Sequence, residues 1–303
     1  MIDTYDALIV GAGPAGLSAA LILGRCRRRV LLCDSGSHRN STSRAIHGLL
    51  GHEGCSPSEL LAIGAKELEK YATVAHTHAE VSTIMPSNGG FRFTCTGNAS
   101  GSARKVLLAT GLVDEVPNLA GIGALYGRSV HHCPYCDGFE HSDQLIAVYG
   151  AGDKGAGLAL MMTQWSSEVI LCTGGEGTVT KAMTQRLSER GIKLFPDPIA
   201  ELEGDGGRLK RIRFQNGEAV ERTAMFFTTG CHQKSNLSKL LGCTRDEKGG
   251  VVTDPVTEET SVPGVYVAGD VSRDVLLVAV AAAEGAKAGV AINHALLKED
   301  GLC

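Results

Sequence analysis

Two short glycine runs in the same local context constrain the fold of this chain more than any other feature. Residues 11–16 read Gly-Ala-Gly-Pro-Ala-Gly after an apolar run, and residues 150–155 read Gly-Ala-Gly-Asp-Lys-Gly after another. A buried strand that turns through glycines into a helix is typical of a βαβ unit that binds a dinucleotide at the helix N-terminus. A single such run is weak evidence, because glycines also form ordinary turns.

The segments that follow each glycine run repeat one order of elements. In the first half we predict, in turn, a helix face, a returning strand, a hairpin and a strand, at residues 17–23, 29–34, 88–90 and 106–111. The second half repeats them at residues 156–165, 168–172, 216–217 and 226–230. This repetition predicts an α/β fold of two Rossmann-like nucleotide-binding domains of the three-layer ββα type.

A late apolar strand decides how the two domains share the chain. Residues 264–270 read as a buried strand that ends in an acid and leads into a small-residue helix at about 275–297. Such a late strand most simply returns to complete the first sheet. We therefore predict a discontinuous first domain at 1–115 plus 245–303, and a central domain at 116–244.

Composition excludes several classes of function. The 303-residue chain is 43% hydrophobic and 20% charged, with a net charge of −4, as in ordinary globular proteins. That charge favours neither nucleic acid nor an anionic membrane surface as a partner. The first residues show no signal-peptide pattern and no stretch is apolar enough to span a membrane, so we expect a cytoplasmic protein.

Only one pair of cysteines has a short spacing. Of ten cysteines, Cys133 and Cys136 alone form a CxxC motif, within Cys-Pro-Tyr-Cys-Asp-Gly just before the second glycine run. Two sulfurs at this spacing can form a reversible disulfide that stores two electrons. The other cysteines are expected to be reduced thiols, and no metal site is expected because His131 and His132 lack further ligands.

With these motifs in their order and spacing, the chain resembles the low-molecular-weight thioredoxin reductase family over nearly its full length. The resemblance implies a homodimer with non-covalently bound FAD and a thioredoxin-like protein or small dithiol as substrate. The residues that it assigns to FAD binding are Gly11, Gly13, Pro14, Ala15, Gly16, Asp34, Asn40, Thr110, Gly111, Gly269 and Asp270.

The resemblance also implies roles in catalysis. Cys136 would face the flavin, and Cys133 would exchange with the substrate. A thiolate that leaves during this exchange needs a proton, and Asp137 is the nearest acid able to give one, although an Asp-Gly pair also forms turns. The roles of His131 and His132 stay open.

The second glycine run departs from the family pattern. Asp34 lies 23 positions after Gly11, and the same spacing from Gly150 reaches Thr173. The family carries a basic cluster for the NADPH 2′-phosphate near residues 172–174, which here read Cys-Thr-Gly. The nearest downstream bases are Lys181 and Arg186, and the family's Arg-Gln pair near the flavin is replaced by apolar residues at 276–278. These departures predict a site unsuited to ordinary NADPH.

Three functions therefore remain open. The first is a thioredoxin reductase-like enzyme whose electron donor is ferredoxin or a second flavin instead of NADPH. The second is an oxygen-dependent oxidase of small dithiols, as in gliotoxin- or holomycin-type pathways. That group often has histidine where this chain has Asp137, which favours the reductase. The third is a flavin redox sensor without turnover.

Overall fold

The structure is a computed structural model that describes residues 3–272 and 275–303, and the chain divides into two compact units. Unit 1 contains Met1–Ser41, Gly48–Val113 and His232–Cys303, and unit 2 contains Thr42–His47 and Asp114–Cys231. The last boundary differs from the expected 244/245. The reason is that Leu237, Leu241 and Cys243 lie in a core cluster of unit 1, so residues 232–244 belong to that unit.

Unit 1 contains a seven-stranded sheet in the order β3-β2-β1-β6-β5-β4, with β17 paired to β6. Its strands are β1 (Asp3–Val10), β2 (Val30–Asp34), β3 (Val74–His78), β4 (Val81–Ser87), β5 (Gly90–Cys95), β6 (Ser100–Leu108) and β17 (Val265–Val267). The expected late strand is β17, and it pairs in parallel with β6. The late strand therefore does return to the first sheet.

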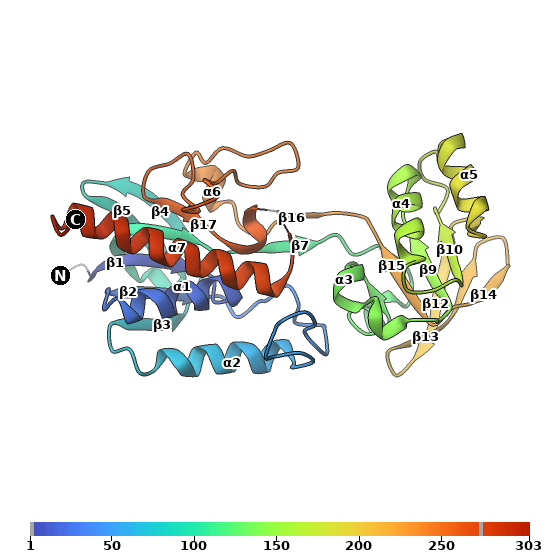
Figure 1. The fold of residues 1–303 in the computed structure, drawn as a ribbon, viewed down its shortest axis with the longest axis horizontal. Coiled ribbons are helices and arrows are strands. Elements are labelled where there is room, and N and C mark those ends of the chain that lie inside the picture. The colour runs from blue at the N-terminus through green and yellow to red at the C-terminus, as the bar shows by residue number, and fades with distance from the viewer. Residues whose placement is uncertain (1–2, 273–274) are drawn as a thin grey trace. The chain divides into compact units, whose positions relative to one another are not determined.

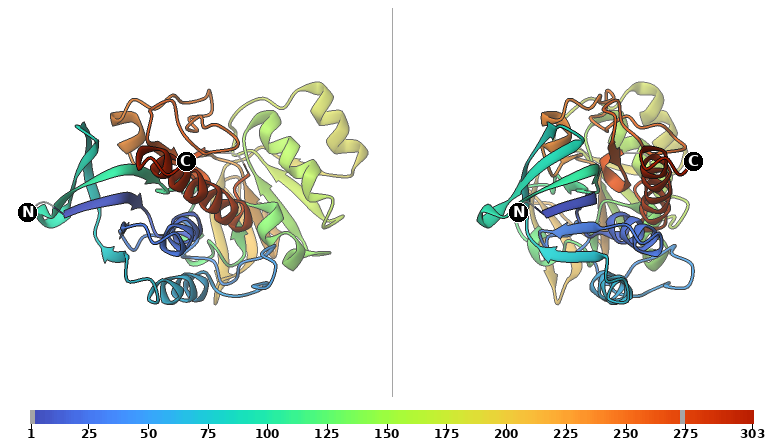
Figure 2. Two further views of the ribbon diagram at one scale, coloured as in Figure 1. Left: turned by 60° about the vertical axis from the view of Figure 1, so that its left-hand side comes forward. Right: turned by 90° about the vertical axis from the view of Figure 1, so that its left-hand side faces the viewer.

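The long helices of unit 1 cover one face of this sheet. The helical segments of unit 1 are α1 (Pro14–Arg25), α2 (Pro57–Leu68), α6 (Leu237–Leu240), α7 (Val278–Glu299), η1 (Thr96–Asn98) and η4 (Gly269–Ser272). Helices α1 and α7 lie side by side against the sheet (Figures 1 and 2). A Cβ atom at Gly285 would lie 2.0 Å from the carbonyl oxygen of Ala15, so small residues permit this close contact.

Alternation along β1 divides the core into two layers. Ala7 and Ile9 point towards α1 and α7, whereas Leu8 and Val10 point towards the apolar side chains of β4 and β5. This period of two is what a strand buried on both faces requires. Full burial of each larger aliphatic side chain contributes about 1.5–3 kcal/mol.

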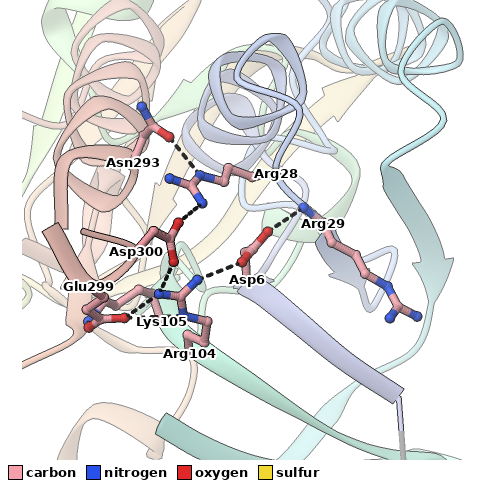
Figure 3. Close-up of polar contacts among 8 residues, drawn as sticks. All are labelled: Asp6, Arg28, Arg29, Arg104, Lys105, Asn293, Glu299 and Asp300. Carbon is pink, nitrogen blue, oxygen red and sulfur yellow. Dashed lines mark hydrogen bonds and ion pairs between the residues drawn. The ribbon is translucent and has the colours of Figure 1, made fainter. Parts of the chain in front are cut away.

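An ion-pair network fastens the C-terminal end of α7 to the sheet (Figure 3). Arg104 on β6 contacts Asp300, Glu299 and Asp6 at 2.7, 2.9 and 3.2 Å. Arg28 contacts the other oxygen of Asp300 at 2.7 Å. Arg28 and Arg104 hold the pKa of Asp300 below its usual range, and Lys105 together with Arg104 does so for Glu299. The network joins four segments that are distant in sequence.

Unit 2 contains a parallel five-stranded sheet in the order β11-β10-β9-β15-β8 and an antiparallel three-stranded sheet in the order β12-β13-β14. The strands are β8 (Val130–His131), β9 (Ile146–Tyr149), β10 (Val169–Cys172), β11 (Lys193–Phe195), β12 (Ile199–Asp205), β13 (Arg208–Phe214), β14 (Ala219–Glu221) and β15 (Ala224–Phe227). The helical segments are α3 (Pro134–Asp137), α4 (Gly152–Met162), α5 (Lys181–Glu189), η2 (Ile122–Ala124) and η3 (Phe139–His141).

The layers of unit 2 follow the same principle as those of unit 1. Ile146 and Val148 pack against α4 and α5, whereas Ala147 packs against the antiparallel strands β12 and β13. Each unit therefore has helices on one face of a parallel sheet and antiparallel strands on the other. The predicted α/β class with two Rossmann-like domains is confirmed.

Some predicted element ends were wrong. The strands expected at 106–111 and 226–230 end at Leu108 and Phe227, and the late helix begins at Val278. In the first case Gly111 has a φ of 72°, which an extended strand does not allow. Strands β7 (Leu112–Asp114) and β16 (Cys231–Gln233) pair where the chain passes between the units.

No helix within the described residues combines the length and the apolar character needed to cross a bilayer.

Candidate active site

The first glycine turn carries α1 directly against the end of β1. Gly11 has a φ of 106°, and its N–H donates to the carbonyl oxygen of Cys33 at 2.8 Å. A Cβ atom at Gly11 would lie 2.3 Å from the carbonyl oxygen of Ala109, and one at Gly16 would lie 1.8 Å from that of Gly11. Both positions therefore exclude a side chain.

Gly13 plays a different part, because it faces open space. It is the N-cap of α1, and a Cβ atom added there would meet nothing within 4 Å. Pro14 is the first helical residue, and the first turn carries no acidic residue. A helix N-terminus with free N–H groups and open space beside it fits the pyrophosphate of a dinucleotide.

Strand register brings the other predicted cofactor residues of unit 1 to the same edge. Val10 on β1 pairs with Cys33 on β2 and with Leu108 on β6, and Leu108 also pairs with Val267 on β17. The strands are parallel, so their carboxyl ends meet. The residues that follow these ends are Gly11, Asp34, Ala109, Thr110, Gly111, Ala268, Gly269 and Asp270. Asn40 lies further along the loop after β2.

Asp34 is held as a carboxylate at the end of β2. One oxygen accepts the N–H of Gly36 at 2.9 Å, and the other lies 3.6 Å from Nε2 of His38. The nearby imidazole of His38 and the hydrogen bond from Gly36 lower the pKa of Asp34 to about 2. Asp34 is thus an acceptor at the position where a ribose hydroxyl lies in nucleotide-binding βαβ units.

Two residues that the sequence reasoning missed hold the Gly-Asp turn after β17. Arg39 forms an ion pair with Asp270 at 2.8 Å. Buried Glu284 on α7 accepts the N–H of Gly269 at 2.6 Å. Glu284 is the only acid between residues 275 and 298, and this isolation within a small-residue helix could have identified it.

The second glycine turn repeats the first in its backbone contacts. The N–H of Gly150 donates to the carbonyl oxygen of Cys172 at 3.1 Å, as Gly11 does to Cys33. A Cβ atom at Gly155 would lie 2.1 Å from the carbonyl oxygen of Gly150. Strand β10 pairs Cys172 with Tyr149 of β9, so Thr173 follows in the register that Asp34 occupies in unit 1.

The loop after β10 contacts the second glycine turn. A Cβ atom at Gly177 would lie 3.0 Å from the backbone nitrogen of Gly152, and Asp153 accepts the N–H of Thr180 at 2.8 Å. Thr173 itself is buried. Residues 173–180 contain one acid and no base, and three of them are glycines with positive φ.

The two cysteines of the CxxC motif form a disulfide. The Cα atoms of Cys133 and Cys136 are 5.3 Å apart, and the other eight cysteines are free thiols. Cys133 is the N-cap of α3, and its sulfur accepts the N–H of Cys136 at 3.2 Å. Pro134 at the first helical position favours this turn.

Asp137, the residue after the disulfide, is the first member of a linear series of polar contacts. Its Oδ1 lies 3.2 Å from Nδ1 of His131, and Nε2 of His131 lies 3.1 Å from Nε2 of His141. Nδ1 of His141 lies 3.2 Å from Oε1 of Gln144. Phe226 packs against both imidazole rings. Sequence reasoning left His131 without a role and missed His141.

His132 lies in a separate group of contacts. Its Nδ1 is 3.2 Å from the hydroxyl of Tyr126, and its Nε2 is 3.7 Å from Asp114. The adjacent histidines thus belong to different polar clusters, because successive side chains of an extended segment point in opposite directions.

The chain is similar to known proteins over nearly its whole length. The family described as Pyridine nucleotide-disulphide oxidoreductase matches residues 5–285. A probable thioredoxin reductase of Arthroderma benhamiae is 29% identical, over 89% of this chain and 74% of the relative. A putative thioredoxin reductase structure from Bacillus anthracis is 31% identical with a TM-score of 0.92, over 98% of this chain and 99% of that one. An oxidoreductase structure from Agrobacterium tumefaciens is 32% identical with a TM-score of 0.90, over 97% and 99%.

Proposed function

Because the chain belongs to the pyridine nucleotide-disulphide oxidoreductase family and is an oxidoreductase of the type that acts on sulfur groups, we propose that it is an FAD-dependent disulfide oxidoreductase. It passes two electrons between FAD, the Cys133–Cys136 pair and a disulfide or dithiol substrate. The observation that carries this proposal is the disulfide between these two cysteines, while the other eight are free.

The edge of the unit 1 sheet supports FAD as the cofactor. Thioredoxin reductases generally bind FAD, which supplies a reversible carrier of two electrons when it is bound. The open space beside Gly13 and the free N–H groups of α1 suit the pyrophosphate, and the carboxylate of Asp34 suits a ribose hydroxyl. Asn40, Thr110, Gly111, Gly269 and Asp270 complete the proposed cofactor residues.

The two cysteines take different roles in this proposal. The N–H of Cys136 donates to the sulfur of Cys133, and a hydrogen bond of this kind stabilises a thiolate on Cys133. Cys133 therefore attacks the substrate disulfide, and Cys136 resolves the mixed disulfide. Asp137 gives a proton to the leaving substrate thiolate.

The electron donor is not ordinary NADPH in this proposal. NADPH recognition needs basic side chains near the end of β10 to hold the 2′-phosphate. Thr173 is buried there, the following residues up to Thr180 include no base, and Glu176 adds a negative charge. Ferredoxin and a second flavin are the candidate donors.

The proposed partner is a thioredoxin-like protein or a small dithiol, and the proposed assembly is a homodimer, as in the related thioredoxin reductases. Tyr135, between the two cysteines, and Phe139 are 70% and 78% exposed. Exposed aromatic side chains beside a redox disulfide provide an apolar contact surface for a substrate.

A second candidate is the oxygen-dependent oxidation of small dithiols. The observation in its favour is the same loop without a basic residue, because an oxidase needs no nicotinamide donor. In this direction Cys136 and Cys133 would accept electrons from the dithiol and pass them to FAD.

Anaerobic titration of the FAD-loaded protein tests the proposal. We expect reduced ferredoxin or a dithiol to reduce the bound flavin and NADPH and NADH to do so slowly or not at all. Oxygen consumption with a dithiol, faster than disulfide reduction with any donor, would support the oxidase instead. If no disulfide or dithiol exchanges electrons with the protein, both candidates fail.

A further inference from the structure

We propose that His131 and His141 are positioning residues that share protons with Asp137, which lets this carboxyl group act as an acid and then as a base during thiol–disulfide exchange. This inference rests on the proposed function and assigns a role to two histidines that neither the motif nor the family match specifies. The evidence is the chain of contacts from Asp137 through His131 and His141 to Gln144.

The orientation of Gln144 fixes one end of this chain. Its Nε2 donates to the carbonyl oxygen of Glu140 at 3.1 Å, and its Oε1 accepts the hydroxyl of Thr223 at 3.2 Å. Both contacts place Oε1 towards His141. Nδ1 of His141 must therefore carry a proton and donate it to Oε1.

The other end is fixed by the carboxyl group. When Asp137 is ionised it can only accept, so Nδ1 of His131 donates to it. The two Nε2 atoms then face each other at 3.1 Å with one proton between them. The two rings together hold three protons and one positive charge, which balances the carboxylate.

Moving two protons converts this state into a neutral one. The Nδ1 proton of His131 passes to Asp137, and the Nε2 proton of His141 passes to Nε2 of His131. Asp137 is then a carboxylic acid and both rings are neutral. The hydrogen bonds between Asp137 and His131 and between the two rings persist with the donor reversed, and Nδ1 of His141 still donates to Gln144. In neither of these two states does Asp137 carry an unpaired negative charge.

Burial of the two imidazole rings favours the transfer of a proton towards Asp137. The side chain of His131 is 5% exposed and that of Asp137 is 21% exposed, so the carboxyl group is the end nearer to solvent. Burial, with a further contribution from the charge of His131, lowers the pKa of His141, while the hydrogen bond with Gln144 and the charges of Asp137 and Glu140 oppose this effect. His141 thus gives up its proton more readily than an ordinary histidine.

The chemical step balances as follows. The thiolate of Cys133 forms a bond with one sulfur of the substrate disulfide, the substrate S–S bond breaks, and the other sulfur leaves with the electron pair. That thiolate takes a proton from Asp137, which leaves a carboxylate beside two neutral imidazole rings, and the Nδ1–H of His131 donates a hydrogen bond to this carboxylate. Asp137 then accepts the proton of the Cys136 thiol as Cys136 attacks the sulfur of Cys133. The bond between Cys133 and the substrate breaks, the second substrate sulfur leaves with the electron pair, and Asp137 passes the proton on to it.

Two disulfide probes separate this role from a structural one. Hydroxyethyl disulfide releases a strongly basic alkyl thiolate that needs a proton, whereas 5,5′-dithiobis(2-nitrobenzoic acid) releases a weakly basic aryl thiolate that needs none. The rate of each probe with the reduced FAD-loaded protein is measured by stopped flow. The reaction of the Cys133→Ser/Cys136→Ser variant is subtracted as the background of the other cysteines.

We expect His141→Gln to slow the alkyl probe at least about tenfold, a part of the roughly 10²- to 10⁴-fold that general acid catalysis contributes, and to change the aryl probe less than about twofold. His131→Gln should act in the same way. His132→Gln is the matched control because His132 contacts Tyr126 and does not belong to the series of contacts that begins at Asp137. The inference is overturned if His141→Gln slows both probes equally, or slows neither. This test holds even if His131→Gln does not fold, because His141 is only half-buried. If the unmodified protein exchanges with neither probe, the proposed function itself fails.

Discussion

Thr173 follows β10 in the same register in which Asp34 ends β2. Tyr149 pairs with Cys172 as Val10 pairs with Cys33, and the next residue is threonine in one unit and aspartate in the other. Two backbone frameworks with matching hydrogen bonds therefore differ at the position that, in nucleotide-binding βαβ units generally, contacts the ribose or its 2′-phosphate.

This difference predicts weak binding of NADPH. Loss of two charge-assisted hydrogen bonds, each worth about 1.5–3 kcal/mol, lowers affinity by roughly 10² to 10⁴ relative to a site with a basic clamp. Glu176→Arg, which adds a base to the exposed loop, should strengthen NADPH binding more than NADH binding in calorimetry. Glu189→Arg on α5 makes the same charge change as a control. Micromolar NADPH affinity in the unmodified protein contradicts this prediction.

Gly13→Ala is expected to weaken FAD binding while the protein still folds. Its φ is −72° and a new Cβ would meet no protein atom within 4 Å, so only a bound pyrophosphate is crowded. We expect at least about a tenfold loss of FAD affinity, equivalent to 1.4 kcal/mol, in fluorescence titration. Gly123→Ala in unit 2 also adds a Cβ without a contact and serves as the control. An unchanged FAD affinity would place the pyrophosphate elsewhere.

Single cysteine variants should distinguish the two sulfurs of the disulfide. Cys133→Ser leaves Cys136 as a lone thiolate, and by resemblance to the family this sulfur contacts the oxidised flavin. We expect a long-wavelength absorption band in Cys133→Ser that is absent in Cys136→Ser and disappears as the thiolate is protonated at low pH. The opposite pattern would reverse the assigned roles.

The ion pairs at the end of α7 predict a stability that depends on pH. The folded-state pKa values of Asp300 and Glu299 lie below their ordinary values of 3.8 and 4.5. A lowered pKa stabilises the folded state above the ordinary pKa, and the contribution is lost as the pH falls through the folded-state value. Arg104→Leu should therefore lower the urea midpoint at pH 7 and have a smaller effect near pH 3.

Lys210→Leu removes an exposed pair with Asp205 at 3.9 Å and is the control for this experiment. Such a pair contributes little, so its midpoint should change less than that of Arg104→Leu. Equal changes in the two variants at pH 7 would show that the network adds nothing beyond ordinary surface charge.

The sequence carried enough information to predict both βαβ units, because apolar strands and glycine turns are local patterns. It also predicted the return of β17 to the first sheet, because a strand that late in the chain most simply returns to complete that sheet. Counting residues from Gly11 and Gly150 identified Thr173 as the counterpart of Asp34, and the strand registers agree with that count.

Contacts between distant segments were not predictable in this way. Arg39 meets Asp270, and His131 meets His141, only after the chain folds, and no spacing rule links these pairs. The boundary near 231 was missed for a related reason. Residues 232–244 have no strong periodic pattern, and only the packing of Leu237 and Leu241 assigns them to unit 1.

The close approach of Gly155 to Gly150 has a consequence for how glycine fingerprints are used. A methyl group at Gly155 would collide with the Gly150 carbonyl oxygen whether or not a ligand is bound, and the same holds for Gly16 and Gly11. These glycines are required by the packing of a helix onto a strand, so they would persist even in a unit that no longer bound a nucleotide. A sequence search that scores the glycine fingerprint alone therefore detects the βαβ fold. The residue after the second strand must also be scored to detect a nucleotide-binding site.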